Sequence, residues 1–201
     1  RGFESLPAHH PFPEVNRRAW RYGLEVHAAR FALCVIPRLP HRCLQRLSYI
    51  LAAIGLRWGG ERGRRAALAN LALVFPERTP AEHRAILERS LQTCILSMLE
   101  VFWLARDTHA RIDRLLQLDD EFDATICNTP AVCITAHMGN WELFGMAVSR
   151  RTGQPLTSVA AAIKNHRVDE LFNHLRQVTG QHMVPRKGAL RHLIKALRSG
   201  G

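Results

Sequence analysis

One short segment combines residue types that could act together in catalysis: Ala136-His137-Met138-Gly139-Asn140-Trp141-Glu142. A histidine with one ring nitrogen held by a carboxylate keeps the other nitrogen free as a general base, and the carboxylate stabilises the imidazolium that forms. We therefore predict that His137 takes a proton from a hydroxyl group and that Glu142 orients it, as acyl transfer from a thioester to that hydroxyl requires. Backbone N–H groups near Gly139 and Asn140 would stabilise the resulting oxyanion.

The same two residues also fit a purely structural explanation. His137 would then be a hydrogen-bonded core histidine, and Glu142 an acid at a helix N-terminus, where the helix dipole favours it. The spacing alone leaves both explanations open. One histidine and one glutamate without further ligands at a recognisable spacing do not make a metal site, so we expect neither a metal nor another cofactor.

The five cysteines are odd in number, and no two of them follow the Cys-x-x-Cys spacing of zinc sites. Most of them lie in apolar runs, so we interpret them as reduced core residues rather than as a disulfide framework. They are Cys34, Cys43, Cys94, Cys127 and Cys133.

The elements around the histidine segment alternate between strand and helix. The apolar run Ala131–Thr135 predicts a buried parallel strand that delivers His137 at its carboxyl end, where α/β sheets hold their ligands. Further along, the pattern predicts helices at 140–150, 168–178 and 190–197 and strands at 156–161 and 182–185. This order predicts an α/β fold with a mostly parallel sheet flanked by helices.

The N-terminal half is predicted to be helical. Residues 20–58 read as two apolar helices broken at Pro37-Arg38-Leu39-Pro40, and we predict that they form a helical hairpin with basic flanks. Packing in a protein core is one role for such a hairpin. Arginine and aromatic residues beside short apolar helices are also typical of a monotopic anchor, so we predict that the hairpin faces a membrane. A further helix is predicted from Thr79, which forms a capping box with Glu82, to about Leu104.

The charge of the chain predicts an anionic partner. Lysine and arginine total 28 against 17 acidic residues, which gives a net charge of +11. Nucleic acid, an anionic membrane surface, a lipid phosphate and a phosphopantetheine carrier would all suit the guanidinium group. The arginines are dispersed and no known nucleic-acid-binding motif is present, so nucleic-acid binding is the weaker alternative. No apolar stretch approaches the roughly 20 residues that span a bilayer.

Several separate blocks of the sequence recur together in one known family. They are Arg65 through Asn70-Leu71 to Phe75-Pro76-Glu77, Glu100 in the long helix, the segment from His137 to Glu142, Asn165 before a helix, and Lys187-Gly188 before another. With these blocks in this order, the stretch from about Trp20 to Gly201 resembles the bacterial lipid A biosynthesis acyltransferase family, which includes lauroyl and myristoyl transferases.

The resemblance implies a glycerolipid-acyltransferase-like α/β fold and an O-acyltransferase activity. The enzyme would move a fatty acyl group from an acyl carrier protein or coenzyme A thioester to a hydroxyl of a glycolipid such as a lipid A precursor. It would be a peripheral or monotopic protein on the cytoplasmic face of the inner membrane, and no nucleic-acid partner is expected. In this family the motif makes His137 and Glu142 the catalytic pair.

The resemblance also points to basic residues as substrate contacts. Many family members carry an Arg-Pro pair at the place where this chain has Ala161-Ala162. Lys164 or Arg167 would then substitute for the missing arginine, although lysine binds as a point charge without the fork of arginine. Arg186 and Lys187 are further candidates for contact with the substrate.

The end of the chain suggests that the domain continues. Family members extend beyond the position of Gly201, and Ser199-Gly200-Gly201 resembles a turn into another strand. We therefore expect residues 1–201 to be a single, incomplete acyltransferase domain with its sheet truncated at the C-terminus. A non-catalytic, membrane-associated relative that keeps the hairpin and half a sheet remains open as an alternative.

Overall fold

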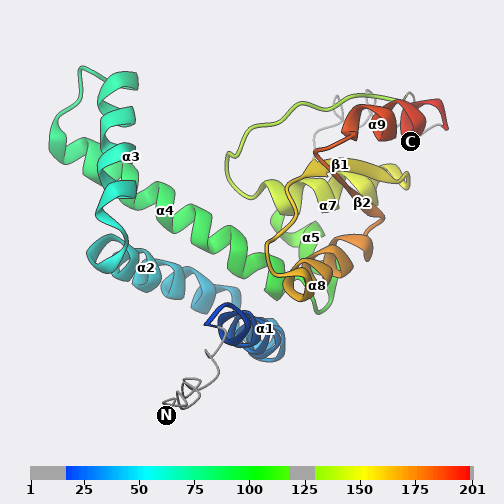
Figure 1. The fold of residues 1–201 in the computed structure, drawn as a ribbon, viewed down its shortest axis with the longest axis horizontal. Helices are drawn as coiled ribbons and strands as arrows, with labels where there is room; N and C mark the ends of the chain where they lie inside the picture. Colours follow the sequence, from blue (N-terminus) through cyan, green and yellow to red (C-terminus); the bar gives the residue numbers. More distant parts are fainter. Residues whose placement is uncertain (1–16, 118–129, 200–201) are drawn as a thin grey trace, which may run out of the picture.

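The computed structural model describes residues 17–117 and 130–199, and Figure 1 shows how its elements follow one another. The N-terminal elements are all helical: α1 (Arg17–Val35), the 3-10 helix η1 (Ile36–Arg38), α2 (His41–Trp58), α3 (Glu61–Val74), α4 (Pro80–Trp103) and α5 (Thr108–Leu115). The C-terminal elements alternate: α7 (Trp141–Thr152), β1 (Leu156–Ala160), α8 (His166–Gln177), β2 (Gln181–Pro185) and α9 (Ala189–Arg198). The predicted helices and the two later strands are therefore confirmed.

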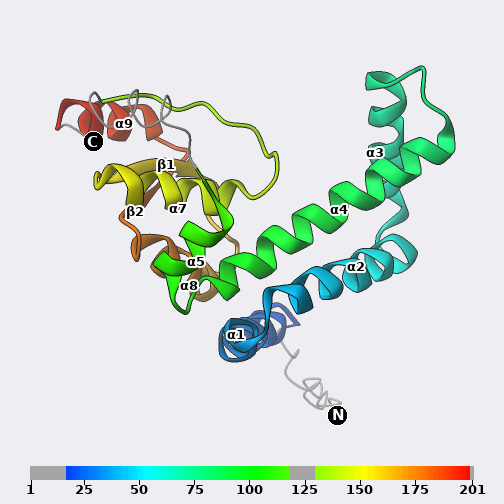
Figure 2. The same cartoon turned by 180° about the vertical axis from the view of Figure 1, so that it is seen from behind.

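Helix α4 is the long connector of the molecule, and it runs from α3 at one end to α5 and α8 at the other (Figure 1). Its start is the predicted capping box, in which the Thr79 N–H donates to Glu82 Oε2 at 2.7 Å and the Glu82 N–H donates to Thr79 Oγ1 at 3.3 Å. Its C-cap is Leu104, which is the predicted end. The start of α4 lies beside α3, far from the sheet, and its last turns approach α7 and α8 (Figures 1 and 2).

Strands β1 and β2 form a two-stranded parallel sheet, with Leu156 opposite Gln181 and Ala160 opposite Pro185. Parallel strands need a crossover connection, and α8 supplies it. In Figures 1 and 2, α9 lies above the strands and α7 below them, and both helices contact the strands. The predicted α/β class with a parallel sheet is confirmed.

The strand predicted at Ala131–Thr135 is wrong. These residues are neither strand nor helix, and their side chains are exposed. Val132 is 70% exposed and Ile134 is 96% exposed. A strand needs a neighbour that satisfies its backbone N–H and C=O groups. Within the described residues, β1 and β2 pair only with each other, so nothing pairs with this segment.

The cysteines also differ from the prediction. The four described ones are free thiols, but all four are exposed rather than in the core: Cys34, Cys43, Cys94 and Cys133. For Cys34, Cys43 and Cys94, which lie on helices, an apolar run that continues around the helix does not tell which side is buried. Cys133 is exposed because the strand predicted around it does not form. Cys127 lies outside the described residues.

Helices α1 and α2 confirm the predicted pair of helices, but they do not lie back along each other as a hairpin. Helix α1 is seen nearly end-on in Figures 1 and 2, whereas α2 runs across the picture, so the chain bends at η1. Helix α2 packs along α4, and α1 reaches α8. No helix in the described ranges is both long enough and apolar enough to cross a membrane.

The hydrophobic core joins the long helices to the α/β part. It draws buried side chains from η1, α2, α4, α5 and α7: Ile36, Leu44, Leu99, Trp103, Leu104, Ile112, Leu143, Met146 and Ala147. The Trp103 ring is anchored, because its Nε1 donates to the Leu39 carbonyl at 2.9 Å and the Arg111 guanidinium lies 4.0 Å from the ring centroid. Because α4 and α7 share this core, the start of α7 is held against α4.

Candidate active site

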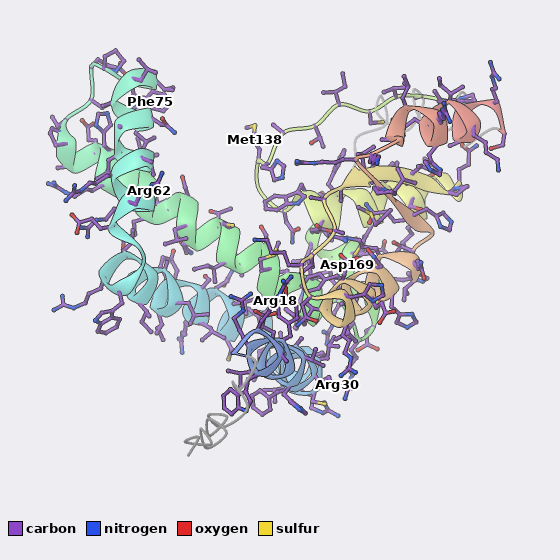
Figure 3. All side chains as sticks on the ribbon, in the orientation of Figure 1. Arg18, Arg30, Arg62, Phe75, Met138 and Asp169 are labelled. Atoms are coloured by element: carbon purple, nitrogen blue, oxygen red, sulfur yellow. The ribbon has the colours of Figure 1, made fainter. Side chains whose placement is uncertain are left out.

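His137 lies on the exposed turn that leads into α7. We call residues 136–140 the histidine turn. The imidazole is exposed, and its ring centroid lies 4.6 Å from that of Trp141. Met138 beside it is 81% exposed, and Figure 3 shows it on the loop away from the packed helices. Gly139 has φ of 59°, a left-handed conformation that glycine adopts without strain. The turn therefore presents the imidazole to solvent, where a substrate can reach it.

Asn140 fixes the end of the histidine turn with both ends of its side-chain amide. Its Oδ1 accepts from the Leu143 N–H at 2.9 Å, which makes it the N-cap of α7. Its Nδ2 donates to Glu100 Oε2 on α4 at 2.6 Å. One side chain thus caps α7 and ties the histidine turn to the long helix.

Glu100 is the buried centre of a polar network behind the histidine turn. Besides Asn140, its carboxylate pairs with His41 Nε2 at the start of α2, at 2.7 Å from Oε1. One turn earlier on α4, the Ser97 hydroxyl lies between two acceptors, the Thr93 carbonyl at 2.9 Å and the Gly139 carbonyl at 3.2 Å, and shares its one proton between them. The network therefore connects α2, α4 and α7 at the point where the histidine turn ends.

Glu142 makes an ion pair with Arg176 of α8. Arg176 Nη2 donates to Glu142 Oε1 at 2.6 Å and Nε donates to Oε2 at 2.8 Å, and each side chain is only 11% exposed. This bidentate geometry, in which one guanidinium donates to both oxygens of one carboxylate, is the strongest form of arginine–carboxylate contact. The structure thus joins Glu142 to Arg176 and His137 to Trp141, and a bond between Glu142 and His137 stays a prediction.

The predicted substrate-binding residues lie in three places. Gly139 and Asn140 belong to the histidine turn. Lys164 is exposed just before α8, and Arg167 is exposed in its first turn. Arg186 and Lys187 are exposed between β2 and α9, at the far end of β2. All four basic side chains are free to meet a soluble ligand, and two of them follow the carboxyl end of a parallel strand directly.

Asn165, which the sequence marked only through the family resemblance, has a defined structural role. It is buried at the start of α8, and its Nδ2 lies 2.9 Å from both the Tyr22 carbonyl and Glu25 Oε2 on α1. The side chain therefore holds α1 against α8. Its partners lie about 140 positions earlier in the sequence, so local pattern gave no signal of this contact.

Sequence reasoning missed His41 and Arg176 and gave Glu100 no role. Each reaches its partner across many residues: 59 between His41 and Glu100, 40 between Glu100 and Asn140, and 34 between Glu142 and Arg176. Buried carboxylates need partners, and this rule could have pointed to the partners of Glu100 and Glu142. The sequence alone does not tell that these two side chains are buried. Within residues 17–117 and 130–199, no three His, Cys, Asp or Glu side chains gather closely enough to hold a metal ion.

Comparison with known proteins adds the family. The family described as Bacterial lipid A biosynthesis acyltransferase matches residues 14–201. The chain is 27% identical over 158 residues to the Lipid A biosynthesis myristoyltransferase of Escherichia coli (strain K12), an alignment that covers 75% of this chain and 48% of that protein. It is 29% identical over 194 residues to the Phosphatidylinositol mannoside acyltransferase of Mycobacterium tuberculosis (strain CDC 1551 / Oshkosh), which covers 93% of this chain and 58% of that protein.

A third relative, Lipid A biosynthesis acyltransferase 2 of Shigella flexneri, is 23% identical over 159 residues, or 75% of this chain and 49% of that protein. The chain thus spans about half the length of the curated relatives it matches. No solved structure matches the chain significantly.

Proposed function

The chain belongs to the family of bacterial lipid A biosynthesis acyltransferases, and from this premise we propose that it provides the catalytic histidine of an enzyme that acylates a glycolipid hydroxyl. The observation that carries the proposal is the exposed imidazole of His137, which sits on a turn fixed from behind by Glu100 and Ser97. A general base must be reachable by its substrate and held in position, and the histidine turn meets both needs.

In the proposed reaction His137 removes the proton from the acceptor hydroxyl, and the oxygen attacks the carbonyl carbon of an acyl thioester. The tetrahedral oxyanion collapses, the carbon–sulfur bond breaks, and the thiolate takes the proton from the imidazolium. The products are an ester and a free thiol. The backbone N–H groups at Gly139, Asn140 and the start of α7 are the donors that we assign to the oxyanion.

We also assign to Glu142 the orientation of the His137 ring. Its ion pair with Arg176 does not prevent this, because each carboxylate oxygen has two lone pairs and accepts more than one hydrogen bond. Arg176 in turn keeps the carboxylate in place during the reaction. Arg176 would thus support the pair through Glu142 rather than by touching the substrate.

Relatives and surface charge support the proposed substrates. The relatives are named for acylation of lipid A and of a phosphatidylinositol mannoside, so we propose a glycolipid acceptor, such as a lipid A precursor, and a thioester donor on acyl carrier protein or coenzyme A. We assign Lys164, Arg167, Arg186 and Lys187 to anionic groups of these substrates, because basic side chains bind phosphate well.

A membrane position is supported by the outer surfaces of α1 and α2. Trp20 and Phe31 on α1 and Trp58 on α2 are each at least 70% exposed, and the Arg57 guanidinium lies 6.0 Å from the Trp58 ring centroid. Exposed aromatic rings next to cations suit the headgroup region of an anionic bilayer. We propose that residues 20–58 face the cytoplasmic leaflet of the inner membrane.

The test is transfer of a labelled acyl group from acyl carrier protein to a lipid A precursor in detergent. We expect His137→Ala to abolish transfer while circular dichroism shows an intact fold. The matched control is His109→Ala, because His109 is an exposed histidine on α5. Equal activity of the His137→Ala and His109→Ala proteins would refute the proposal and favour a non-catalytic relative.

A further inference from the structure

Helix α9 carries positive charges that no acidic residue balances. No aspartate or glutamate follows Glu170 in the sequence. On α9 the side chains of Arg191, Lys195 and Arg198 are exposed, and none of the three has a hydrogen-bond or ion-pair partner among the described residues. These cations are therefore available to an anionic partner.

The stability of α9 itself does not explain all of this charge. Lys195 and Arg198 lie in the last turn, where the helix dipole favours cations. Arg191 lies in the first turn, where the dipole disfavours a cation, and the like charge of Lys195 follows four residues later. Both effects destabilise the free helix, so Arg191 indicates a requirement other than helix formation.

An apolar edge lies beside the cations of α9. At about 100° per residue, five exposed side chains follow one another within about 140° around the helix. In order around the helix they are Leu190, Ile194, Arg198, Arg191 and Lys195, and we call them the basic face of α9. Leu190 is 70% exposed and Ile194 is 41% exposed. An apolar patch with charged side chains along its edge resembles the core and rim of a protein–protein interface.

The shape and position of the basic face favour a folded protein as the partner. The outer side of a helix is convex, whereas small-molecule sites are concave. The opposite side of α9 packs on β1 and β2, which leaves Leu190 and Ile194 as the exposed large apolar side chains of this helix, too few to insert into a bilayer. In Figures 1 and 2, α9 lies at the upper end of the molecule and α1 at the lower end, so α9 is far from the bilayer that the proposed function places against α1.

Helix α9 also follows directly on residues that the proposed function assigns to the substrates. Gly188, with φ of 79°, turns the chain between Lys187 and the first residue of α9. Arg186 and Lys187 follow the carboxyl end of β2, and ligands of α/β sheets bind at that end of the strands. A protein docked on the basic face would thus hold its thioester arm next to these two residues.

We propose that the basic face of α9 is the docking surface for acyl carrier protein, and that it binds an acidic helix of that protein. The inference rests on the proposed function, in which the donor is a thioester on acyl carrier protein or coenzyme A. Of these two donors only the carrier protein is a folded protein, so the basic face selects it. The cations attract the acidic partner before contact, and the two apolar side chains hold it afterwards.

The experiment measures binding rather than turnover. Acyl carrier protein without its phosphopantetheine arm is labelled with a fluorophore and titrated with the full chain, and fluorescence anisotropy gives the affinity. We expect Arg191→Glu combined with Lys195→Glu to weaken binding about tenfold, and added salt to weaken binding by the unmodified chain. The matched control is Arg84→Glu combined with Arg89→Glu, which reverses two exposed arginines on α4 and should leave the affinity unchanged.

A second measurement separates a protein partner from a membrane. Sedimentation with phosphatidylglycerol vesicles should be equal for the two double variants. The proposal would be overturned by equal affinity of both double variants for the carrier protein, or by no binding of the carrier protein to the unmodified chain. Loss of vesicle binding in the α9 variant, with its affinity for the carrier protein unchanged, would also overturn it and would assign the basic face to the membrane. Because a carrier protein without its arm cannot react, these outcomes do not depend on whether His137 catalyses acyl transfer.

Discussion

Removing Arg176 tests the role of the ion pair beneath the histidine turn. Arg176→Met keeps much of the side-chain volume but leaves the Glu142 carboxylate buried without its two charged hydrogen bonds. Breaking a buried pair by removing one partner costs about 3–5 kcal/mol. We therefore expect Arg176→Met to lower the free energy of unfolding by about 3–5 kcal/mol at pH 7.

The assay is urea unfolding at pH 7 followed by tryptophan fluorescence, with the m-value checked for constancy. The double variant Glu142→Leu with Arg176→Met removes both charges and should recover most of the lost stability. Arg150→Met is the matched control, because its ion pair with Asp113 is as short, at 2.6 Å, but its side chains are 31% and 58% exposed. It should cost less than about 1 kcal/mol. A loss below about 1 kcal/mol for Arg176→Met, or no recovery in the double variant, would refute this reasoning.

Three further predictions follow from the contacts behind the histidine turn and from the cap of α4. Glu100→Gln should reduce kcat for acyl transfer about tenfold with little change in KM, because the histidine turn loses its anchor, while exposed Glu88→Gln on the same helix should change neither constant. Asn140→Ala should lower the free energy of unfolding by about 1–2 kcal/mol through loss of the α7 cap, and Asn140→Asp should not rescue it, since a second carboxylate would face Glu100 at about hydrogen-bond distance. The backbone N–H of Thr79, and then its hydroxyl, hold the pKa of Glu82 below its ordinary value of 4.5. The stability that this cap adds is thus present above pH 4.5 and is lost as the pH falls through the lowered pKa of Glu82. The difference in urea midpoint between the unmodified protein and Glu82→Gln should therefore vanish in acid. A difference that persists in acid would contradict the assignment.

The elements around the histidine turn were predicted in part. Helix α7 starts next to Asn140, as the sequence predicted, and the roles of the site residues stay predictions. The delivery of His137 by a buried strand is wrong, because burial of Ala131–Thr135 would need a neighbouring strand and the described residues supply none. Apolar composition predicts that a segment prefers to be buried, but the segment becomes a strand only when a neighbouring strand pairs with it.

By itself the sequence determined the elements whose causes are local. The Thr79–Glu82 cap closes within three residues, the helical periods need one turn to be recognised, and a strand–helix–strand order within 30 residues requires a parallel pair. Only the tertiary structure decided which charges meet. With 28 basic and 17 acidic side chains, the sequence offers each acid many equivalent cations. Packing alone places Arg176 on Glu142 and His41 on Glu100, since a buried charge must pair with whichever partner the fold brings within reach.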